Sequence, residues 1–320
     1  MSSNATPVGE GLLNIHKPRG LTSFDVVGRV RQQTRIARVG HAGTLDPQAS
    51  GVLLVGLGKG TKLTQFLHEL PKSYRATLRL GVRTDTHDAA GTVIAVRAVR
   101  PLAWEDVSAI LASFQGSIEQ LPPMYSALKW RGQRLYALAR RGIEVERQPR
   151  RVQIFRLALL TLTPEAMTLE VDCSSGTYIR VLADDIGVRL GCGAHLAELV
   201  RTAIGPFTLE HALTLEALEE AVRQGVWHTH LIPLPAGVAA FPAIVVTATA
   251  ARAIARGTPP PLGEVCRVEG SFGVGGTVAV RGPEGRLLAM GTALFHAAEL
   301  GQVPNTTPAM RLRRVLIDQY

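Results

Sequence analysis

The sequence predicts a mixed α+β fold arranged in two domains. Helical and strand-like hydrophobic periods alternate from residue 11 to about 225, without the regular strand-helix repeat of a doubly wound sheet or a barrel. Residues 236–310 are rich in Val, Gly and Thr with short strand patterns, which indicates a small β domain. The chain has 320 residues, enough for two domains, and its 46% apolar and 19% charged residues exclude wholesale disorder.

The first elements follow from local patterns. Leu12, Leu13 and Ile15 predict a strand. Thr22 then stands where it can cap a helix in which the three valines of residues 26–30 share one face. Residues 51–55 predict a short buried strand.

A half-buried strand is predicted at residues 72–80, because apolar and polar side chains alternate there and place Tyr74 at the start of a core-facing row. The spacing of Val107, Ile110, Leu111 and Phe114 predicts an amphipathic helix. Next, residues 152–162 and 167–173 flank a turn at Pro164 and predict a hairpin.

Two more helices are predicted, at residues 179–186 and 214–226. The stretch 228–242 holds three prolines and a glycine and little periodicity, so we expect a domain boundary near residue 236. The strands expected beyond it are residues 265–268, 277–280 and 287–290.

Positive charge is concentrated in one segment. The net charge is +9 and the pI about 10.0, which favours polyanions as partners. Residues 124–152 hold eight basic and two acidic groups, and so six of the nine net charges. Tyr125, Trp130 and Tyr136 lie among the basic residues, which are Lys129, Arg131, Arg134, Arg140, Arg141, Arg147, Arg150 and Arg151. Cations beside planar rings predict a nucleic-acid-binding surface, whereas a solvated helix face would explain the charges but not their concentration in one segment.

Two further segments carry weaker signals. Gly56–Thr61 follows a strand as a phosphate-binding loop would, but Gly60 separates Lys59 from Thr61, and a tight connection is the favoured interpretation. Asp85, His87 and Asp88 could ligate a metal, yet short polar side chains between glycines more often cap their own turn, so no metal site is predicted.

The three cysteines, Cys173, Cys192 and Cys266, form neither a CxxC pair nor a disulfide ladder, and we expect reduced core thiols. The first eleven residues lack the pattern of a signal peptide, and no window approaches the roughly 20 apolar residues of a membrane span. These features favour a soluble cytoplasmic protein without a membrane partner.

The segment 38–51 is a candidate catalytic loop. Its three glycines and Pro47 hold Asp46 on a tight, irregular stretch, where a carboxylate can be presented for chemistry. An aspartate that merely caps a turn before Pro47 explains the same pattern equally well. The residues of this loop alone leave the two interpretations open.

Taken with its neighbours, this loop resembles the tRNA pseudouridine-55 synthases of the TruB family. The similar blocks occur in family order over residues 11 to about 208: 11–23, 40–47, 72–75, 80–88, 123–129, 173–180 and 193–196 leading to Leu199 and Arg201-Thr202. The part beyond residue 236 resembles, more loosely, the PUA-type RNA-binding domain that such enzymes often carry. The resemblance implies a largely antiparallel sheet with flanking helices in a catalytic domain at 1–235, a basic RNA-gripping insertion at about 124–152, and a PUA-like domain at 236–320.

The implied activity is the isomerisation of one uridine in the T-arm loop of tRNA, without cofactor or metal. By resemblance Asp46 is the catalytic carboxylate, either as nucleophile or as the base that opens an elimination route. Arg180 would pair with it and favour its charged form. Tyr74 and Tyr178 would hold the flipped uracil, and Tyr74 is also placed to take part in removing the C5 proton.

Supporting roles are implied for three more residues. Leu199 would supply an apolar wall, His41 would contact the RNA at the vacated place in the loop, and Lys17 would support the active-site loops. The implied partner is the T-arm stem-loop of tRNA, bound by a monomer that needs no other protein. Two alternatives remain at this point: a non-catalytic RNA-binding or chaperone protein on the same scaffold, and a synthase acting on other RNAs within guide-RNA assemblies.

Overall fold

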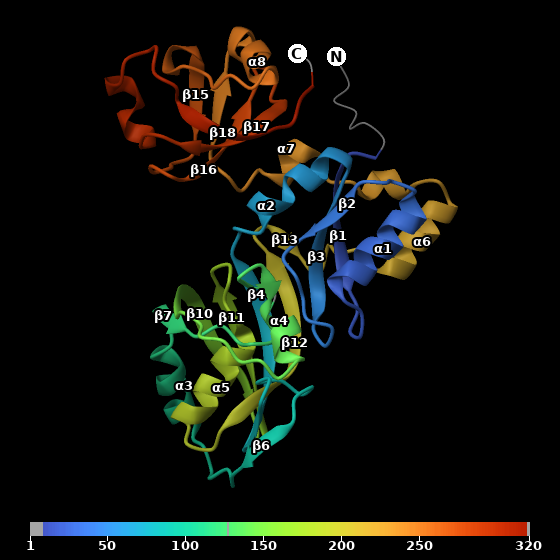
Figure 1. Ribbon diagram of the computed structural model, residues 1–320, viewed down its shortest axis with the longest axis vertical. Coiled ribbons are helices and arrows are strands. Elements are labelled where there is room, and N and C mark those ends of the chain that lie inside the picture. The colour runs from blue at the N-terminus through green and yellow to red at the C-terminus, as the bar shows by residue number, and fades with distance from the viewer. Residues whose placement is uncertain (1–8, 127, 319–320) are drawn as a thin grey trace.

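The computed structural model describes residues 9–126 and 128–318 and confirms the mixed α+β class (Figure 1). Within these ranges the chain forms a larger body on a nine-stranded sheet and a smaller body on a five-stranded sheet. The strands of the larger sheet are β1 (Gly11–Lys17), β2 (Val39–Ala42), β3 (Ser50–Leu57), β4 (Lys72–Leu80), β7 (Gly116–Gln120), β10 (Arg150–Leu162), β11 (Ala166–Cys173), β12 (Ala194–Ile204) and β13 (Phe207–Thr208).

The order of the larger sheet decides which loops meet. It runs β1-β3-β12-β4-β11-β10-β7, with β2 beside β3 and β13 beside β12. All of its pairings are antiparallel except that of β12 with β3, where Val200 and Arg201 pair with Ser50 and Gly51. Because β12 enters between β3 and β4, the loop before β3 lies against Arg201, which comes more than 150 positions later in the sequence.

Helices cover the two halves of this sheet differently. The helices with their bounds are α1 (Ser23–Thr34), α2 (Thr64–Leu67), α3 (Trp104–Ala112), α4 (Leu135–Ala139), α5 (Ile179–Arg189), α6 (Leu215–Arg223), α7 (Leu234–Gly237) and α8 (Ala248–Ala255). Side chains of α3 and α5 pack on β4, β10 and β11, whereas α1 and α6 pack on β1 and β3. Among the described residues, no helix is long and apolar enough to cross a membrane.

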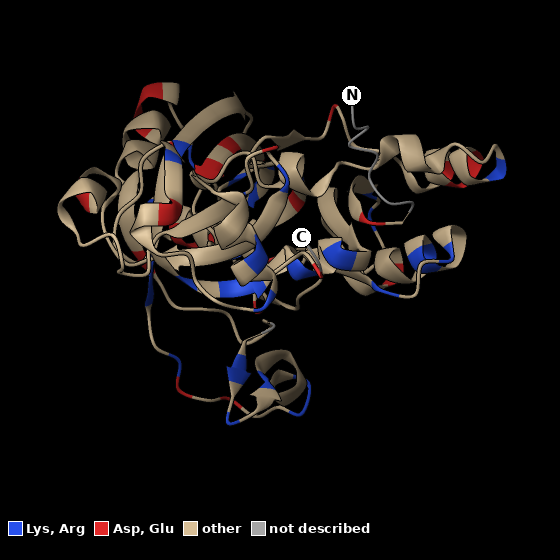
Figure 2. Cartoon of the chain, turned by 90° about the horizontal axis from the view of Figure 1, so that it is seen from above, with Lys and Arg blue, Asp and Glu red and all other residues tan. Residues whose placement is uncertain are grey.

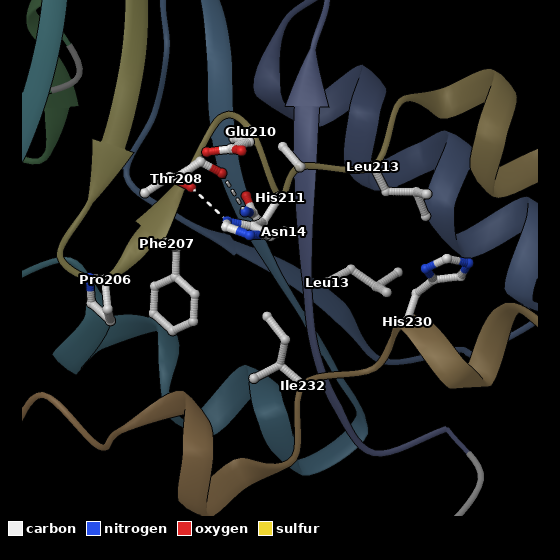
Figure 3. A pocket seen from close by; sticks show the side chains of 11 residues that line it. Leu13, Asn14, Pro206, Phe207, Thr208, Glu210, His211, Leu213, His230 and Ile232 are labelled. Carbon is white, nitrogen blue, oxygen red and sulfur yellow. Dashed lines mark hydrogen bonds between the residues drawn. The ribbon is translucent and has the colours of Figure 1, made fainter.

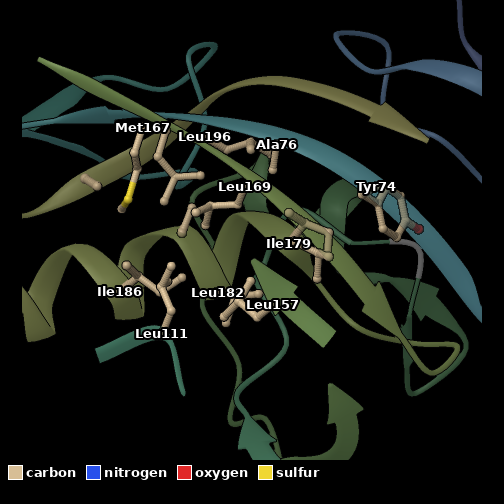
Figure 4. Close-up of a cluster of buried hydrophobic side chains, with 14 of the residues drawn as sticks. Tyr74, Ala76, Leu111, Leu157, Met167, Leu169, Ile179, Leu182, Ile186 and Leu196 are labelled. Atoms are coloured by element: carbon tan, nitrogen blue, oxygen red, sulfur yellow. The ribbon is translucent and has the colours of Figure 1, made fainter. Parts of the chain in front are cut away.

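The core under α3 and α5 positions one predicted site residue. It contains the inward row of β4, as the alternation predicted, and Figure 4 shows Tyr74 at one edge of this cluster. The predicted helix around Val107 ends at Ala112 rather than at Phe114, because the chain turns there towards β7, through Gly116 at φ +95°. Phe114 still packs against the same core from outside the helix.

Capping explains the start of α1. Thr22 accepts a hydrogen bond from the Asp25 N–H, and the Asp25 carboxylate accepts one from the Thr22 N–H, which together form a capping box. The predicted valine face is buried against β1 and β3. The predicted strand at residues 12–15 is β1, and the predicted hairpin is the antiparallel pair of β10 and β11.

The smaller body follows the predicted β pattern. Its strands are β14 (Ala243–Val246), β15 (Val265–Glu269), β16 (Thr277–Arg281), β17 (Leu287–Ala293) and β18 (Met310–Val315), in the order β15-β14-β16-β17-β18. Three of these strands were predicted, and β14 and β18 were not. Cys266 lies exposed on the edge strand β15, so the prediction of a core thiol is wrong for this residue, while Cys173 and Cys192 are buried.

An apolar core is shared by the two bodies. Leu12 and Phe66 of the larger body belong to one buried cluster with Met290 and Leu316 of the smaller body. At the rim, Arg313 lies 4.7 Å from the Phe66 ring centroid and pairs with Glu69 at 3.1 Å. The bodies are therefore packed together by hydrophobic burial as well as by polar contacts.

The glycine segment after β3 forms a tight connection. Residues Gly58–Lys62 make a short 3-10 turn, and a Cβ on Gly60 would lie 2.0 Å from the Gly11 carbonyl oxygen. Lys59 pairs with Asp318 at 2.8 Å. The interpretation as a plain connection is confirmed, because these glycines permit close backbone packing.

Two short ribbons complete the larger body. They are β5 (Val82–Thr84) with β6 (Val93–Val96), and β8 (Lys129–Trp130) with β9 (Gln133–Arg134). Asp88 lies in the connection between the two strands of the first ribbon. The second belongs to the basic segment.

Candidate active site

Asp46 lies in the loop between β2 and β3, and α1 anchors this loop. The Ser23 hydroxyl at the start of α1 accepts a hydrogen bond from the Leu45 N–H at 2.9 Å and lies 3.3 Å from the Leu45 carbonyl oxygen, to which it donates. The Leu45 side chain is buried in the core. Asp46 therefore follows a residue that is fixed on both its backbone and its side chain.

The Asp46 carboxylate is directed at Arg180. Its Oδ2 lies 3.1 Å from a guanidinium nitrogen of Arg180, the second residue of α5. The Asp46 side chain is 46% exposed, whereas that of Arg180 is 7% exposed. An accessible carboxylate thus meets a buried cation.

A second carboxylate shares the same cation. Asp88 Oδ2 lies 3.6 Å from the other terminal nitrogen of Arg180, and Arg180 also donates to the Tyr125 carbonyl oxygen at 2.9 Å. From the sequence, Asp88 was a weak candidate metal ligand or, more favoured, a turn cap, and its contact with Arg180 was not predicted. Its place in the block 80–88, which resembles the family, was the signal available.

The turn around Asp88 is held by its own short side chains. Asp88 Oδ1 accepts hydrogen bonds from the Thr86 hydroxyl at 2.6 Å and from the Ala90 N–H at 3.0 Å. Asp85 accepts from the Thr92 N–H at 2.8 Å. Within the part of the chain that the structure describes, no group of three metal-ligating side chains is found. Asp85 and Asp88 thus cap turns through Oδ1, and Oδ2 of Asp88 contacts Arg180.

Tyr74 on β4 is a buried residue beside Arg201. Burial raises the pKa of the Tyr74 hydroxyl, with the Arg201 guanidinium acting in the opposite direction. Arg201 is itself buried and pairs with Tyr74 across β12 and β4. Tyr74 is consequently a neutral phenol near pH 7.

Arg201 ties the Asp46 loop to the sheet, a role that the sequence analysis did not assign. Its guanidinium donates to the Val52 carbonyl oxygen at 2.8 Å and to that of Gly43 at 2.9 Å. A further donation reaches the Thr44 carbonyl oxygen at 3.4 Å. Both ends of the loop are therefore held by one fully buried cation from β12.

Lys17 contacts the backbone near the same loop. Its ammonium donates to the carbonyl oxygens of Leu21 at 2.6 Å, Pro18 at 3.0 Å and Pro47 at 3.4 Å. Burial lowers the pKa of Lys17 to about 8, although the Asp46 charge acts to raise it. Its ammonium is thus hydrogen-bonded to backbone oxygens before the start of α1 and just after Asp46.

His41 lies on β2, next to the exposed Phe24 of α1. The two ring centroids are 5.4 Å apart with an interplanar angle of 88°, an edge-to-face pair. Burial lowers the pKa of His41, and Arg201 and His68 lower it further, so the imidazole is neutral near pH 7. Its Nδ1 is buried without a hydrogen-bond partner among the described residues.

Tyr178 and Leu199 come from two elements near the Asp46–Arg180 pair, the start of α5 and β12. Tyr178 is the N-cap residue of α5, and its N–H donates to the side chain of Gln120 at 3.0 Å. Leu199 pairs with Ala76 across β12 and β4. Together with Asp46 and Asp88, Leu199 lines a small pocket of about 20 Å³.

A larger cavity of about 360 Å³ lies elsewhere, between β1, β13 and residues 210–213 and 230–232 (Figure 3). Asn14, Phe207 and His211 are among its lining residues, and Asp46 is not. The Asn14 amide donates to the Thr208 carbonyl oxygen, and Thr208 bonds His211. Asn14 Oδ1 is buried without a hydrogen-bond partner among the described residues, and the Asp46–Arg180 pair lies outside this cavity.

The basic segment 124–152 extends from the body of the protein (Figure 2). It has a small core of its own, formed by Leu135, Leu138 and Val145. Arg131 lies 4.5 Å from the Trp130 ring centroid, and Arg140 lies 5.7 Å from that of Tyr136. The remaining predicted RNA-binding residues are Lys129 and Arg134 on β8 and β9, Arg141, and Arg150 and Arg151 at the start of β10.

Exposure is common to most of this basic set. Arg131, Arg140, Arg141 and Arg150 are exposed, and exposed Arg151 pairs with Glu119 at 3.6 Å. Tyr125 at the base of the segment accepts a hydrogen bond from Arg180. The basic segment and the Asp46 pocket are therefore structurally connected.

Comparison with known proteins shows the family of this chain. The model of the TruB family pseudouridylate synthase N-terminal domain matches residues 31–179, that of the tRNA pseudouridylate synthase B C-terminal domain matches 180–234, and that of the PUA domain matches 242–316. A tRNA pseudouridine synthase B of Geobacter sulfurreducens is 44% identical over 96% of this chain and 99% of its own length. One of Burkholderia pseudomallei is 45% identical over 89% and 93%.

A solved structure has a similar fold. The chain matched in the crystal structure of a Cbf5-Nop10-Gar1 complex has a TM-score of 0.81 and 26% identity, over 97% of this chain and 86% of that one. The curated relatives are matched over nearly their full length, so the similarity extends through both bodies. The chain therefore belongs to the TruB family of pseudouridylate synthases and is an isomerase.

Proposed function

We propose that this enzyme converts uridine to pseudouridine at position 55, in the T-arm loop of tRNA, with Asp46 as its catalytic carboxylate. The observation that carries the proposal is the half-exposed Asp46 carboxylate held 3.1 Å from a buried Arg180, beside a neutral buried Tyr74. The names of the curated relatives support tRNA as the substrate.

The atoms of the reaction balance within the target nucleotide, because the reaction is an isomerisation. The bond from N1 of the uracil to C1′ of the ribose breaks, a bond from C5 to C1′ forms, and the C5 proton leaves as N1 gains one. Asp46 acts either by attacking the nucleotide or by removing a proton to open an elimination route. Both routes begin from an ionised carboxylate, to which Arg180 presents a positive partner at 3.1 Å.

The target base must leave the stack before it can react. Flipping costs a few kcal/mol, and contacts in the pocket recover this cost. We assign Tyr74 and Tyr178 to hold the flipped uracil, with Leu199 as an apolar wall. Because burial keeps Tyr74 protonated, its hydroxyl can donate a hydrogen bond or relay a proton.

Two residues act around the pocket. We assign neutral His41 to the RNA loop at the position that the uridine vacates. Lys17, through its hydrogen bonds to the Leu21 and Pro47 carbonyl oxygens, maintains the shape of the Asp46 loop. Neither residue is required to transfer a proton in this scheme.

RNA binding is assigned mainly to the basic segment. Its exposed arginines can neutralise phosphates, and its rings can stack on bases. We propose a catalytic domain at residues 1–235 and an auxiliary RNA-binding domain at 236–320, which act on tRNA as one monomer. The connection through Tyr125 would couple RNA gripping to the position of Arg180.

The test is release of tritium from a T-arm hairpin labelled at C5 of the target uridine. We expect release to water without added cofactor, and loss of release in Asp46→Asn with hairpin affinity nearly unchanged. Asp106→Asn, an exposed aspartate in the first turn of α3, is the matched control and should behave as the parent. Normal release by Asp46→Asn would contradict the assignment, and binding without release by the parent would favour a non-catalytic RNA-binding protein.

A further inference from the structure

An exposed phenylalanine lies beside the Asp46 loop. Phe24 is 69% exposed on the first turn of α1, directly after Ser23, which holds the Leu45 backbone. A single exposed apolar residue is ordinary on a protein surface. Phe24 differs because its ring also packs edge-to-face against His41, on the strand that leads into the catalytic loop.

The same face of α1 continues away from the site. Gly28 and Arg31 follow Phe24 at intervals of four and three residues, which places these three positions along one side of the helix, and Arg35 is the C-cap residue just past its end. An Arg31 nitrogen lies 3.4 Å from the Val39 carbonyl oxygen of β2. Phe24 and Arg31 thus both border β2, and we call the surface of these four residues the α1 lane.

The α1 lane is open at its middle. A Cβ placed on Gly28 would meet no atom within 4 Å, so the helix surface there is bare and unobstructed. Arg31 and Arg35 are exposed, and the nearby Asp25 carboxylate is engaged by Thr22 in the capping box. From Phe24 to Thr34, the last residue of α1, the helix rises roughly 15 Å at 1.5 Å per residue, which is longer than one nucleotide.

We propose that the α1 lane binds the single-stranded RNA that flanks the flipped uridine, with one base stacked on Phe24 and the backbone phosphates near Arg31 and Arg35. The proposal rests on the proposed function of the Asp46 site. An aromatic ring at the site end and cations along the rest are the chemistry that grips single-stranded nucleic acid. The position of Phe24 beside His41 places the stacked base next to the nucleotide that reacts.

This role makes Phe24 a substrate-positioning residue rather than a catalytic one. Removing the ring should weaken RNA binding and leave the reaction of bound RNA intact. We therefore expect Phe24→Ala to raise KM for a T-arm hairpin by about five- to a hundredfold, the range of base–aromatic stacking, with kcat unchanged. Phe24→Trp should restore the parent KM, because the larger ring also stacks.

The control is Phe155→Ala. Phe155 is 55% exposed on β10, where its neighbour Ile154 points into the core. This variant removes a ring of the same type from another surface and should leave KM unchanged. Equal effects of Phe24→Ala and Phe155→Ala would overturn the proposal.

Two more variants probe the rest of the lane. Gly28→Glu should raise KM by placing a charged side chain across the open surface. Replacing Arg31 and Arg35 together by Gln should lower the slope of log K against log salt by about 1.4, from roughly 0.7 per phosphate contact on a single strand. An unchanged slope together with a parental KM for Gly28→Glu would overturn the proposal.

Direct binding separates this proposal from the proposed function. Hairpin affinity is measured for Phe24→Ala on the Asp46→Asn background, where chemistry is removed. Weakened binding there supports the α1 lane even if the labelled parent releases no tritium. Tritium release by the parent together with unchanged binding of the Phe24 variant would overturn the lane and leave the proposed function standing.

Discussion

Arg180→Lys tests whether the two-carboxylate arrangement at the active site matters for catalysis. Arg180 contacts Asp46 through one terminal nitrogen at 3.1 Å and Asp88 through the other at 3.6 Å. A lysine keeps the positive charge but offers a single point of contact, so it cannot reproduce both contacts in the same geometry. The substitution therefore separates the effect of the positive charge of residue 180 from the effect of its two directed contacts.

The magnitude follows from the geometry. At 3.1 Å and an effective dielectric constant near 20, the attraction between Arg180 and Asp46 is at most about 5 kcal/mol. The half-exposed Asp46 is screened by solvent, which reduces this value. Losing a preorganised electrostatic contact typically costs about 3 to 4 kcal/mol of transition-state stabilisation. We expect the rate of bound RNA to fall roughly 100- to 1000-fold.

The assay is a single-turnover measurement of tritium release at saturating enzyme, with hairpin affinity measured in parallel. Arg180→Met is less informative, because it leaves Asp88 without its cation and can cost about 3 to 5 kcal/mol of stability. A thermal melt must show that Arg180→Lys is folded. A folded variant with a rate within threefold of the parent would refute the reasoning.

Three further predictions follow from the structure. Burial lowers the pKa of Lys17 to about 8, so between pH 8 and about 10 the unfolded chain binds more protons than the folded protein and stability rises with pH. The parent's free energy of unfolding should gain about 1.6 kcal/mol more than that of Lys17→Met between pH 8 and 9.5, and equal gains in urea titrations would contradict this. Replacing four arginines of the basic segment by Gln should flatten the salt dependence of tRNA binding, measured by filter binding; the four are Arg140, Arg141, Arg150 and Arg151. An unchanged slope would show that these arginines are solvated and do not contact phosphates. Arg313→Ala removes the contacts with Phe66 and Glu69 and should destabilise the packing of the two bodies by about 1 to 2 kcal/mol, read from calorimetry, with no loss in saturated rate.

The shared core also changes how the smaller body can be tested. Removing residues 236–320 would expose Leu12 and Phe66, which are fully buried against residues of that body. Such a truncation is prone to aggregation, which would imitate a loss of catalysis. Interface substitutions such as Arg313→Ala therefore report more cleanly on the contribution of the smaller body to binding.

Local patterns in the sequence were sufficient for much of the fold. The helix after Thr22 was predicted from its cap and its valine face, and the strand 72–80 from strict alternation, because both signals depend on neighbours within a few residues. The concentration of charge at 124–152 was equally visible, since a charge count needs no coordinates. The candidate Asp46, in contrast, was chosen over a turn cap only by family resemblance.

The arrangement around Asp46 was decided by tertiary structure alone. Asp88 was visible as an acidic residue, but its contact with Arg180 depends on how the β5 ribbon and α5 meet. Arg201 reaches Gly43 and Val52 only because β12 enters the sheet between β3 and β4. Hydrophobic periodicity determines which face of each element is buried, whereas the order of strands determines which distant side chains share a buried space, and periodicity carries no information about that order.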